Sequence, residues 1–250
     1  MGLHVEREGV GPRVVLVHGF TQTGRCWGDE VTALAADHEV LRVDAPGHGG
    51  SADVRADLVR GARLLGEAGG RAAYVGYSMG ARLCLHLAVR APELVRGLVL
   101  IGGTPGLEDD AERAARRAQD QHTAERLRAG GLDAFLASWL DQPLFAGLPP
   151  NRRFTDERQA NTVEGLASSL ELAGTGSQDS LWDRLPSLTM PVLVVAGALD
   201  SKFADIATRM AAAIGDRATL ALLPGAGHAA HLEQPASFLA ALRPWLTQLT

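Results

Sequence analysis

Cysteine is scarce in this sequence of 250 residues, which contains only Cys26 and Cys84. The two stand in no spacing pattern that indicates a disulfide framework, and we expect Cys84, within a predicted helix, to be a small buried hydrophobic residue. No apolar run approaches the length that spans a bilayer, and residues 1–7 lack the apolar core of a signal peptide. We therefore expect a soluble, cytoplasmic protein with no stable membrane insertion.

A basic stripe is also absent. The 24 Lys and Arg residues and the 29 Asp and Glu residues give a formal net charge of -5, which argues against nucleic acid as a partner. No cluster of Cys, His, Asp and Glu has the spacing of a metal site, and no Gly-rich loop suits a dinucleotide. We expect neither a metal nor another cofactor. The sequence leaves open whether the chain is a monomer or a homo-oligomer.

What the sequence does contain is an alternation of apolar strands and helices. Its hydrophobic fraction of 46% is ample for a large core. Strands are expected at 3–7, 14–17, 40–43, from 72 onward, 98–101, 191–196 and 218–223, and helices at 27–36, 54–68, 79–90, 204–214 and the C-terminus. This alternation predicts an α/β fold with a mostly parallel sheet flanked by helices and joined by right-handed crossovers.

The alternation stops between residues 107 and 188, where we find helical stretches and no clear strand. We expect an all-helical lid insertion at 107–188, within a core formed by residues 1–106 and 189–250.

The stretch around Ser78 carries the strongest chemical signal. Gly76-Tyr77-Ser78-Met79-Gly80 follows an apolar strand and precedes a helix, as in a nucleophile elbow, where a tight turn exposes a serine. The glycines permit the close backbone approach that such a turn needs. Ser78 is therefore a candidate nucleophile or base.

Two further residues follow strands whose carboxyl ends meet at the same sheet edge. Asp200 comes after the strand at 191–196, and His228 after the strand at 218–223. An imidazole takes the proton of the serine, and a carboxylate orients the imidazole, so Ser78, Asp200 and His228 form a candidate triad. His231 is an alternative base, but His228 directly follows a tight glycine turn and is better placed. In the competing interpretation, Asp200 only caps a helix and His228 is a surface residue.

A candidate oxyanion hole lies between two backbone N–H groups, those of Phe20 and Met79. The side chain of Phe20 fits core packing as well as a substrate wall. We expect Asp44 and His48 to be structural and to hold the loop after their strand.

Arg82 breaks a local rule, because a cation in the first turn of a helix opposes the helix dipole. It lies four residues after Ser78, on the same helical face. A substrate carboxylate near the elbow would compensate for this charge, whereas the plainer alternative is a solvated arginine that points outward.

These motifs resemble the α/β-hydrolase superfamily over the whole chain. More narrowly, the chain resembles the family of 2-succinyl-6-hydroxy-2,4-cyclohexadiene-1-carboxylate synthases, lyases of menaquinone (vitamin K2) biosynthesis. The resemblance is carried by 18–20, 44–49, 76–82, 139–145, 174–178 with 181–182, 200–203 and 225–233. Met79 and Ala81 depart mildly from the family, which commonly has Leu and Gly there.

The resemblance implies a pyruvate elimination from an enolpyruvyl cyclohexene carboxylate, with a proton abstracted by Ser78 and an enolate held in the oxyanion hole. The partner would be a small anionic substrate with several carboxylates. The family's substrate-binding residues would correspond to Arg82, Arg116, Arg158, Tyr77 and Trp139. Arg113 and Arg117 remain alternatives to Arg116, because a slip of the alignment would exchange them.

Two other functions stay open on the same residues. The first is a serine carboxylesterase or C–C bond hydrolase, which a neutral pocket and a solvent-facing Arg82 would favour, because one fold hosts many chemistries. The second is a small-molecule receptor that keeps an intact triad without turnover.

Overall fold

The computed structural model describes residues 2–249. Its strands form one seven-stranded sheet of order β1-β3-β2-β4-β5-β6-β7, in which β1 pairs antiparallel with β3 and the other pairs are parallel. The strands are β1 (Val5–Glu8), β2 (Arg13–Val17), β3 (Glu39–Val43), β4 (Ala72–Tyr77), β5 (Val95–Ile101), β6 (Val192–Gly197) and β7 (Ala218–Leu223). The predicted α/β class with a mostly parallel sheet is confirmed.

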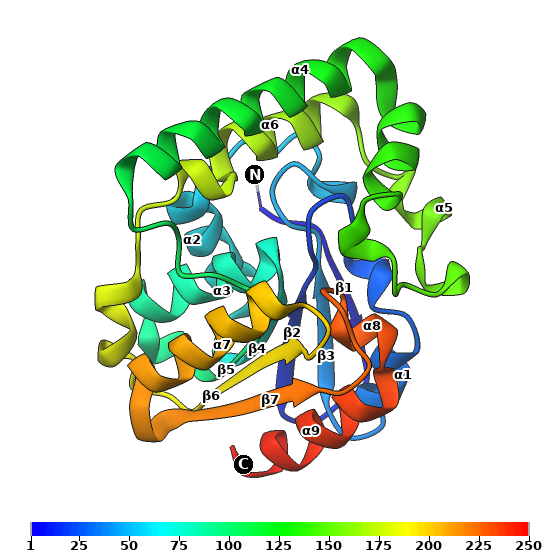
Figure 1. Cartoon of the computed structure of the whole chain (residues 1–250). Coiled ribbons are helices and arrows are strands. Elements are labelled where there is room, and N and C mark those ends of the chain that lie inside the picture. The colour runs from blue at the N-terminus through cyan, green and yellow to red at the C-terminus, as the bar shows by residue number, and fades with distance from the viewer. Residues whose placement is uncertain (1, 250) are drawn as a thin grey trace.

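Helices cover both faces of this sheet (Figure 1). The α-helices are α1 (Asp29–Ala35), α2 (Leu58–Gly69), α3 (Met79–Arg90), α4 (Asp110–Leu140), α5 (Thr155–Arg158), α6 (Val163–Ala173), α7 (Ser201–Ile214), α8 (Ala230–Glu233) and α9 (Pro235–Thr247). Short 3₁₀ helices occupy Gly24–Trp27, Gly49–Ser51, Pro92–Leu94, Pro143–Phe145, Pro150–Arg152, Thr175–Ser177, Trp182–Ser187 and Gly215–Arg217.

The core lies in two layers, one on each face of the sheet. On one face, apolar side chains of α2, α3 and α7 pack against the strands. On the other face, side chains of α1, α8 and α9 do so. The central strands are buried on both faces: the four residues from Val14 to Val17 and every residue of β4 and β6 are shielded from water. This burial explains the continuous apolar runs in the sequence.

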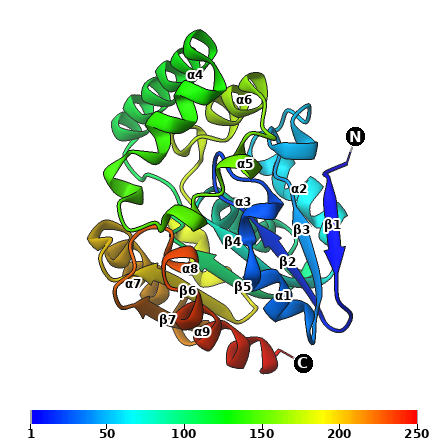
Figure 2. The same ribbon diagram turned by 90° about the vertical axis from the view of Figure 1, so that its right-hand side faces the viewer.

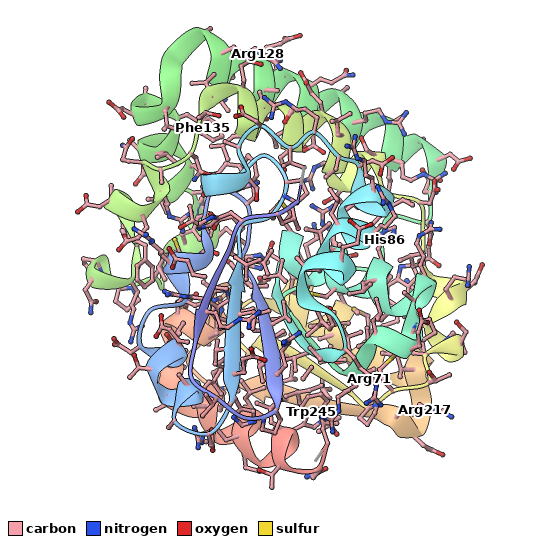
Figure 3. All side chains as sticks on the ribbon, turned by 180° about the vertical axis from the view of Figure 1, so that it is seen from behind. Arg71, His86, Arg128, Phe135, Arg217 and Trp245 are labelled. Carbon is pink, nitrogen blue, oxygen red and sulfur yellow. The ribbon has the colours of Figure 1, made fainter. Side chains whose placement is uncertain are left out.

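Between β5 and β6 the described chain forms helices only, and these lie above the carboxyl ends of the strands (Figures 1 and 2). Helix α4 is interrupted at Gly131, whose φ of 77° and ψ of 173° are not helical. Helices α4 and α6 pack around a small apolar cluster of their own. Arg128, at the top of this layer in Figure 3, pairs with Glu164 and Glu171 of α6. We call residues 107–188 the lid; its boundaries as a domain stay a prediction.

Three helix boundaries differ from the sequence-based expectation. Helix α2 starts at Leu58 rather than 54, because the side chain of Asp57 caps it by accepting the N–H of Arg60. Helix α7 starts at Ser201 rather than 204, because the side chain of Asp200 caps it by accepting the N–H of Phe203. The helix expected at 27–36 is split into a 3₁₀ turn and α1, because Gly28 has a φ of 57°.

Two further observations concern covalent links and membranes. Cys26 and Cys84 are both free and buried, as expected for Cys84. Among residues 2–249, no helix combines the length and the apolar character that crossing a membrane requires.

Candidate active site

Ser78 occupies a strained turn between β4 and α3. Its φ of 51° and ψ of -106° lie outside the regions that non-glycine residues prefer. The flanking glycines are required sterically, because a Cβ on Gly76 would collide with the backbone of Gly80, and a Cβ on Gly80 would collide with the carbonyl of Val17. The N–H of Ser78 donates to the carbonyl of Ile101 at 2.8 Å, which fixes the turn against β5.

The structure brings Ser78, His228 and Asp200 together. Nε2 of His228 lies 3.3 Å from Oγ of Ser78, and Nδ1 of His228 lies 2.9 Å from Oδ2 of Asp200. The imidazole is buried, with 4% of His228 exposed, so water competes little for these contacts. The distances suit a proton relay from the hydroxyl to the imidazole, with the carboxylate orienting the ring.

Asp200 both caps α7 and faces His228. Its Oδ1 accepts the N–H of Phe203 at 3.2 Å, while Oδ2 faces the imidazole. Burial by itself would raise the pKa of this carboxyl, but the hydrogen bonds from His228 and from the N–H of Phe203 outweigh it and lower the pKa below the ordinary value of 3.8. The carboxyl is therefore held in its charged form. Asp200 therefore caps α7, as the competing interpretation held, but it also faces His228, which is buried rather than a surface residue.

His231, the alternative base, lies elsewhere. Its ring packs against Trp27 at 4.7 Å and Tyr77 at 4.5 Å between centroids. Its Nδ1 is buried and, within residues 2–249, has no hydrogen-bond partner. Burial lowers its pKa to about 3, so the ring stays neutral. His228, rather than His231, lies beside Ser78.

The loop that carries His228 is held by Glu233, a residue to which the sequence analysis assigned no role of its own. The carboxylate of Glu233 accepts the N–H of Gly227 at 2.7 Å and that of Ala229 at 3.0 Å. These two residues flank His228 on either side. No local sequence pattern distinguishes such a carboxylate from one that caps a helix, so only the structure reveals this clamp.

The proposed oxyanion donors, Phe20 and Met79, follow β2 and β4, which are adjacent in the sheet. Within residues 2–249, the backbone N–H groups of both residues have no acceptor in the chain and are free to bind an oxygen. The ring of Phe20 lies 5.0 Å from that of Trp139 and 5.6 Å from that of His48, between lid and core.

Buried histidines and Asp44 hold the loops around Phe20, which carries one of the two proposed oxyanion donors. Nε2 of His18 accepts the N–H of Ala45 at 3.0 Å, and burial lowers the pKa of His18 to about 4. Asp44 accepts the N–H groups of Gly24 and Gly50 at 2.7 and 2.8 Å, so its role is structural, as the sequence indicated. His48 is fully buried and its Nδ1 donates to the carbonyl of Pro46, which makes it structural too.

Arg82 is buried rather than solvated, so the interpretation as an outward surface arginine is wrong. Only 8% of it is exposed. Its Nη1 donates to the carbonyl of Ala173 at 2.7 Å and lies 3.4 Å from Oε1 of Gln178. Burial, and then the nearby charge of Arg116, lower its pKa to about 10. Among residues 2–249 it forms no salt bridge; the charge of Asp120, which pairs with Arg116, acts on it from a distance and opposes this lowering.

Arg113 and Arg117 were alternatives to Arg116 as the substrate-binding arginine of the lid. Of these three, Arg116 is the one whose charge acts on Arg82. Nε of Arg116 contacts Oδ1 of Asp120 at 2.9 Å. Arg113 instead pairs with Asp110, and Arg117 donates to the carbonyl of a lid glycine.

Arg158 is fully buried on another side of the site. Its Nη1 donates to Oγ1 of Thr21, and its Nε donates to the carbonyl of Arg153 at 2.8 Å. Burial lowers its pKa. Tyr77 is buried between His228 and His231, and burial raises the pKa of its hydroxyl above its ordinary range.

Trp139 lies at the underside of the lid, in contact with the ring of Phe135 at 5.7 Å and that of Phe145 at 6.2 Å. Its Nε1 is buried and, in the part of the chain that the structure describes, unpartnered.

Among residues 2–249, no three His, Cys, Asp or Glu side chains are grouped to hold a metal ion.

Comparison with known proteins places this arrangement in a family. A model described as the alpha/beta hydrolase family matches residues 14–242. The chain belongs to the α/β-hydrolase family. Its sheet order, elbow and helical layer over the strand ends are those of a member of this family.

Individual relatives show to which members of the α/β-hydrolase family this chain is similar. The 2-succinyl-6-hydroxy-2,4-cyclohexadiene-1-carboxylate synthase of Escherichia coli O1:K1 / APEC is 36% identical over 243 residues, which cover 92% of this chain and 92% of that protein. The Arabidopsis thaliana protein PHYLLO, chloroplastic, is 30% identical over 265 residues, and the match spans only 16% of its length. The solved structure of MenH from S. aureus has a TM-score of 0.90 at 27% identity and covers 98% of both chains. Within the α/β-hydrolases, this chain belongs with the synthases.

Proposed function

We propose that this α/β-hydrolase is a lyase. It eliminates pyruvate from 2-succinyl-5-enolpyruvyl-6-hydroxy-3-cyclohexene-1-carboxylate and gives 2-succinyl-6-hydroxy-2,4-cyclohexadiene-1-carboxylate, a step of menaquinone biosynthesis. The observation that carries this proposal is the 36% identity to a synthase of that name over 92% of both chains. The burial of Arg82 near the elbow, without a salt bridge in the part of the chain that the structure describes, supports it from the chemistry.

In the proposed reaction, Ser78 acts as a base. Its Oγ removes a ring proton next to the succinyl ketone and passes its own proton to Nε2 of His228, while Asp200 stabilises the imidazolium. The electron pair of the C–H bond forms an enolate, whose oxygen is bound by the N–H groups of Phe20 and Met79. The enolate then collapses, the ring double bonds shift, and the C–O bond to the enolpyruvyl group breaks. The departing enolate of pyruvate takes back a proton.

The substrate carries three carboxylates, which explains why cations are buried near the site. We assign Arg82, Arg116 and Arg158 to these carboxylates, because guanidinium groups bind them in bidentate fashion. Tyr77 and Trp139 would line the pocket. No step changes an oxidation state, and a base, an oxyanion hole and cationic clamps suffice, so the proposal includes no cofactor. The cytoplasmic location stays a prediction.

The hydrolase alternative uses the same triad. A neutral pocket and an Arg82 that points into solvent would have favoured it. The observed burial of Arg82 weighs against it. The receptor alternative predicts no turnover of any substrate.

The deciding experiment is a coupled assay of pyruvate release from the enolpyruvyl precursor. We expect turnover by the wild type and a loss of at least roughly 10³-fold in Ser78→Ala, by analogy with other triads. Ser187→Ala is the matched control, because Ser187 is exposed and its hydroxyl donates to the carbonyl of Arg184, three residues earlier in the chain. Turnover of simple esters without pyruvate release would replace the lyase by the hydrolase, and no turnover at all would favour the receptor.

A further inference from the structure

Asn161 is a buried lid residue, 4% exposed, to which neither the sequence analysis nor the proposed mechanism gives a role. It follows α5 and makes three hydrogen bonds. Its Nδ2 donates to the carbonyl of Thr21 at 2.8 Å and to the carbonyl of Arg158 at 2.9 Å. Its Oδ1 accepts the N–H of Gly49 at 3.0 Å. A single amide side chain thus joins three loops.

The segment it holds is strained. Thr21 has a φ of 66°, in the left-handed region that is unfavourable for a β-branched residue. Such a conformation persists only where surrounding contacts impose it, and it is a feature of functional sites. Here the contacts come from the lid: Asn161 holds the carbonyl of Thr21, and Arg158 donates to its hydroxyl. Figure 2 shows α5 beside the blue segment that follows β2.

Thr21 directly follows Phe20, whose N–H is the proposed oxyanion donor. The direction of that N–H depends on the backbone on either side of it. On the N-terminal side, the N–H of Gly19 donates to Oε1 of Gln22 at 2.9 Å. On the C-terminal side, the bond from Asn161 constrains the peptide group between Thr21 and Gln22.

We propose that Asn161 is a positioning residue for the oxyanion hole, which couples the docked lid to the direction of the Phe20 N–H. This inference rests on the proposed role of that N–H. With the lid in place, Asn161 imposes the left-handed conformation on Thr21. Without this contact, Thr21 relaxes toward an ordinary conformation, and the Phe20 N–H turns away from the enolate oxygen. The effect falls on the transition state, because the enolate exists only there and after it.

The test compares Asn161→Ala and the isosteric Asn161→Asp with Asn151→Ala. The sequence contains only these two asparagines, and Asn151 is an exposed lid residue, so it is the matched control. We expect the kcat for pyruvate release to fall roughly 10- to 100-fold in both Asn161 variants, with a KM change of less than about threefold, because a misdirected donor costs about 10² in rate. Asn151→Ala should match the wild type.

Two further readouts separate positioning from general damage to the fold. Amide hydrogen exchange over residues 19–22 should be at least about tenfold faster in Asn161→Ala, with the protection of β4 and β5 unchanged. In a Thr21→Gly background, where the left-handed conformation carries no strain, the kcat penalty of Asn161→Ala should shrink at least about threefold.

Unchanged exchange over residues 19–22 in Asn161→Ala overturns the proposal, whether or not the wild type releases pyruvate. Faster exchange with an unchanged kcat, or an equal kcat penalty in the Thr21→Gly background, overturns the catalytic part. If the wild type releases no pyruvate, the lyase function fails by itself, and the exchange experiment still decides whether Asn161 holds the loop.

Discussion

Arg82 donates a 2.7 Å hydrogen bond to the carbonyl of Ala173, at the end of α6, 91 residues further along the chain. The cation that follows Ser78 on α3 is therefore tied to the lid rather than extended into water. Peptide and amide dipoles satisfy part of its charge. Among residues 2–249 no carboxylate forms a salt bridge with it, although the charge of Asp120, which pairs with Arg116, acts on it from a distance. If Arg82 binds a substrate carboxylate, as we propose, this hydrogen bond links the charge of the substrate to the position of the lid.

Arg82→Ala should reduce kcat/KM for the anionic precursor by roughly 10- to 150-fold, since hydrogen bonds to charged groups contribute about 1.5–3 kcal/mol. Hydrolysis of a neutral aryl ester should fall far less. Steady-state kinetics on both substrates measure the difference. Arg82→Lys keeps the charge but loses the planar fork, so we expect an intermediate loss.

The control for this experiment is Arg90→Ala, because Arg90 is an exposed arginine at the end of the same helix. It should leave both activities unchanged. An equal loss on both substrates in Arg82→Ala would mean that Arg82 holds the lid and does not bind substrate.

Glu233→Gln should lower kcat by about tenfold with little change in KM. Its carboxylate accepts the N–H groups of Gly227 and Ala229, and an amide at this place offers one acceptor and points an N–H at the other donor. His228 then loses its fixed orientation toward Ser78. Kinetics and thermal unfolding measured together check this, with the exposed Glu67→Gln as control. A lowered melting temperature with unchanged kcat would make the clamp purely structural.

Stability should fall as pH falls below about 6.5. Burial lowers the pKa of His18 and His86 to about 4 and that of His48 and His231 to about 3. The unfolded chain binds these protons near pH 6.5, whereas the folded chain does not until pH 3–4. In this window the unfolded state carries more protons, so each histidine costs about 1.4 kcal/mol of unfolding free energy per pH unit on acidification.

Urea unfolding at pH 7.5, 6 and 5 measures this slope. His86→Leu should flatten it, because both ring nitrogens of His86 are buried and unpartnered in the described chain. The variant His122→Gln, at an exposed position, should leave it as in the wild type. A free energy of unfolding that stays constant from pH 7.5 to 5 would contradict the assignment of neutral, buried histidines.

Local patterns accounted for much of the fold. Strand β7 and helix α3 have the bounds that the sequence indicated. The mostly apolar run of β7 ends at Pro224, although most of this edge strand is exposed or partly buried, and α3 begins where the elbow needs its glycines. The helix starts were harder to predict from the sequence, because they depend on capping side chains. Asp57 and Asp200 move helix starts by several residues, since a carboxylate accepts backbone N–H groups that apolar periodicity does not reveal.

The sequence by itself determined which residues follow the strands, and hence that Ser78, Asp200 and His228 meet at one sheet edge, because parallel strands end together. It did not determine what surrounds them. The partners of Arg82, the clamp of Glu233 on the His228 loop and the bridge of Asn161 to Thr21 join segments that are distant in the chain or lie in loops without periodicity. The packing of the lid on the sheet decided the contacts of Arg82 and Asn161, and the conformation of the loop after β7 decided the clamp of Glu233, because a buried polar group takes whichever partner the tertiary fold brings within hydrogen-bond distance.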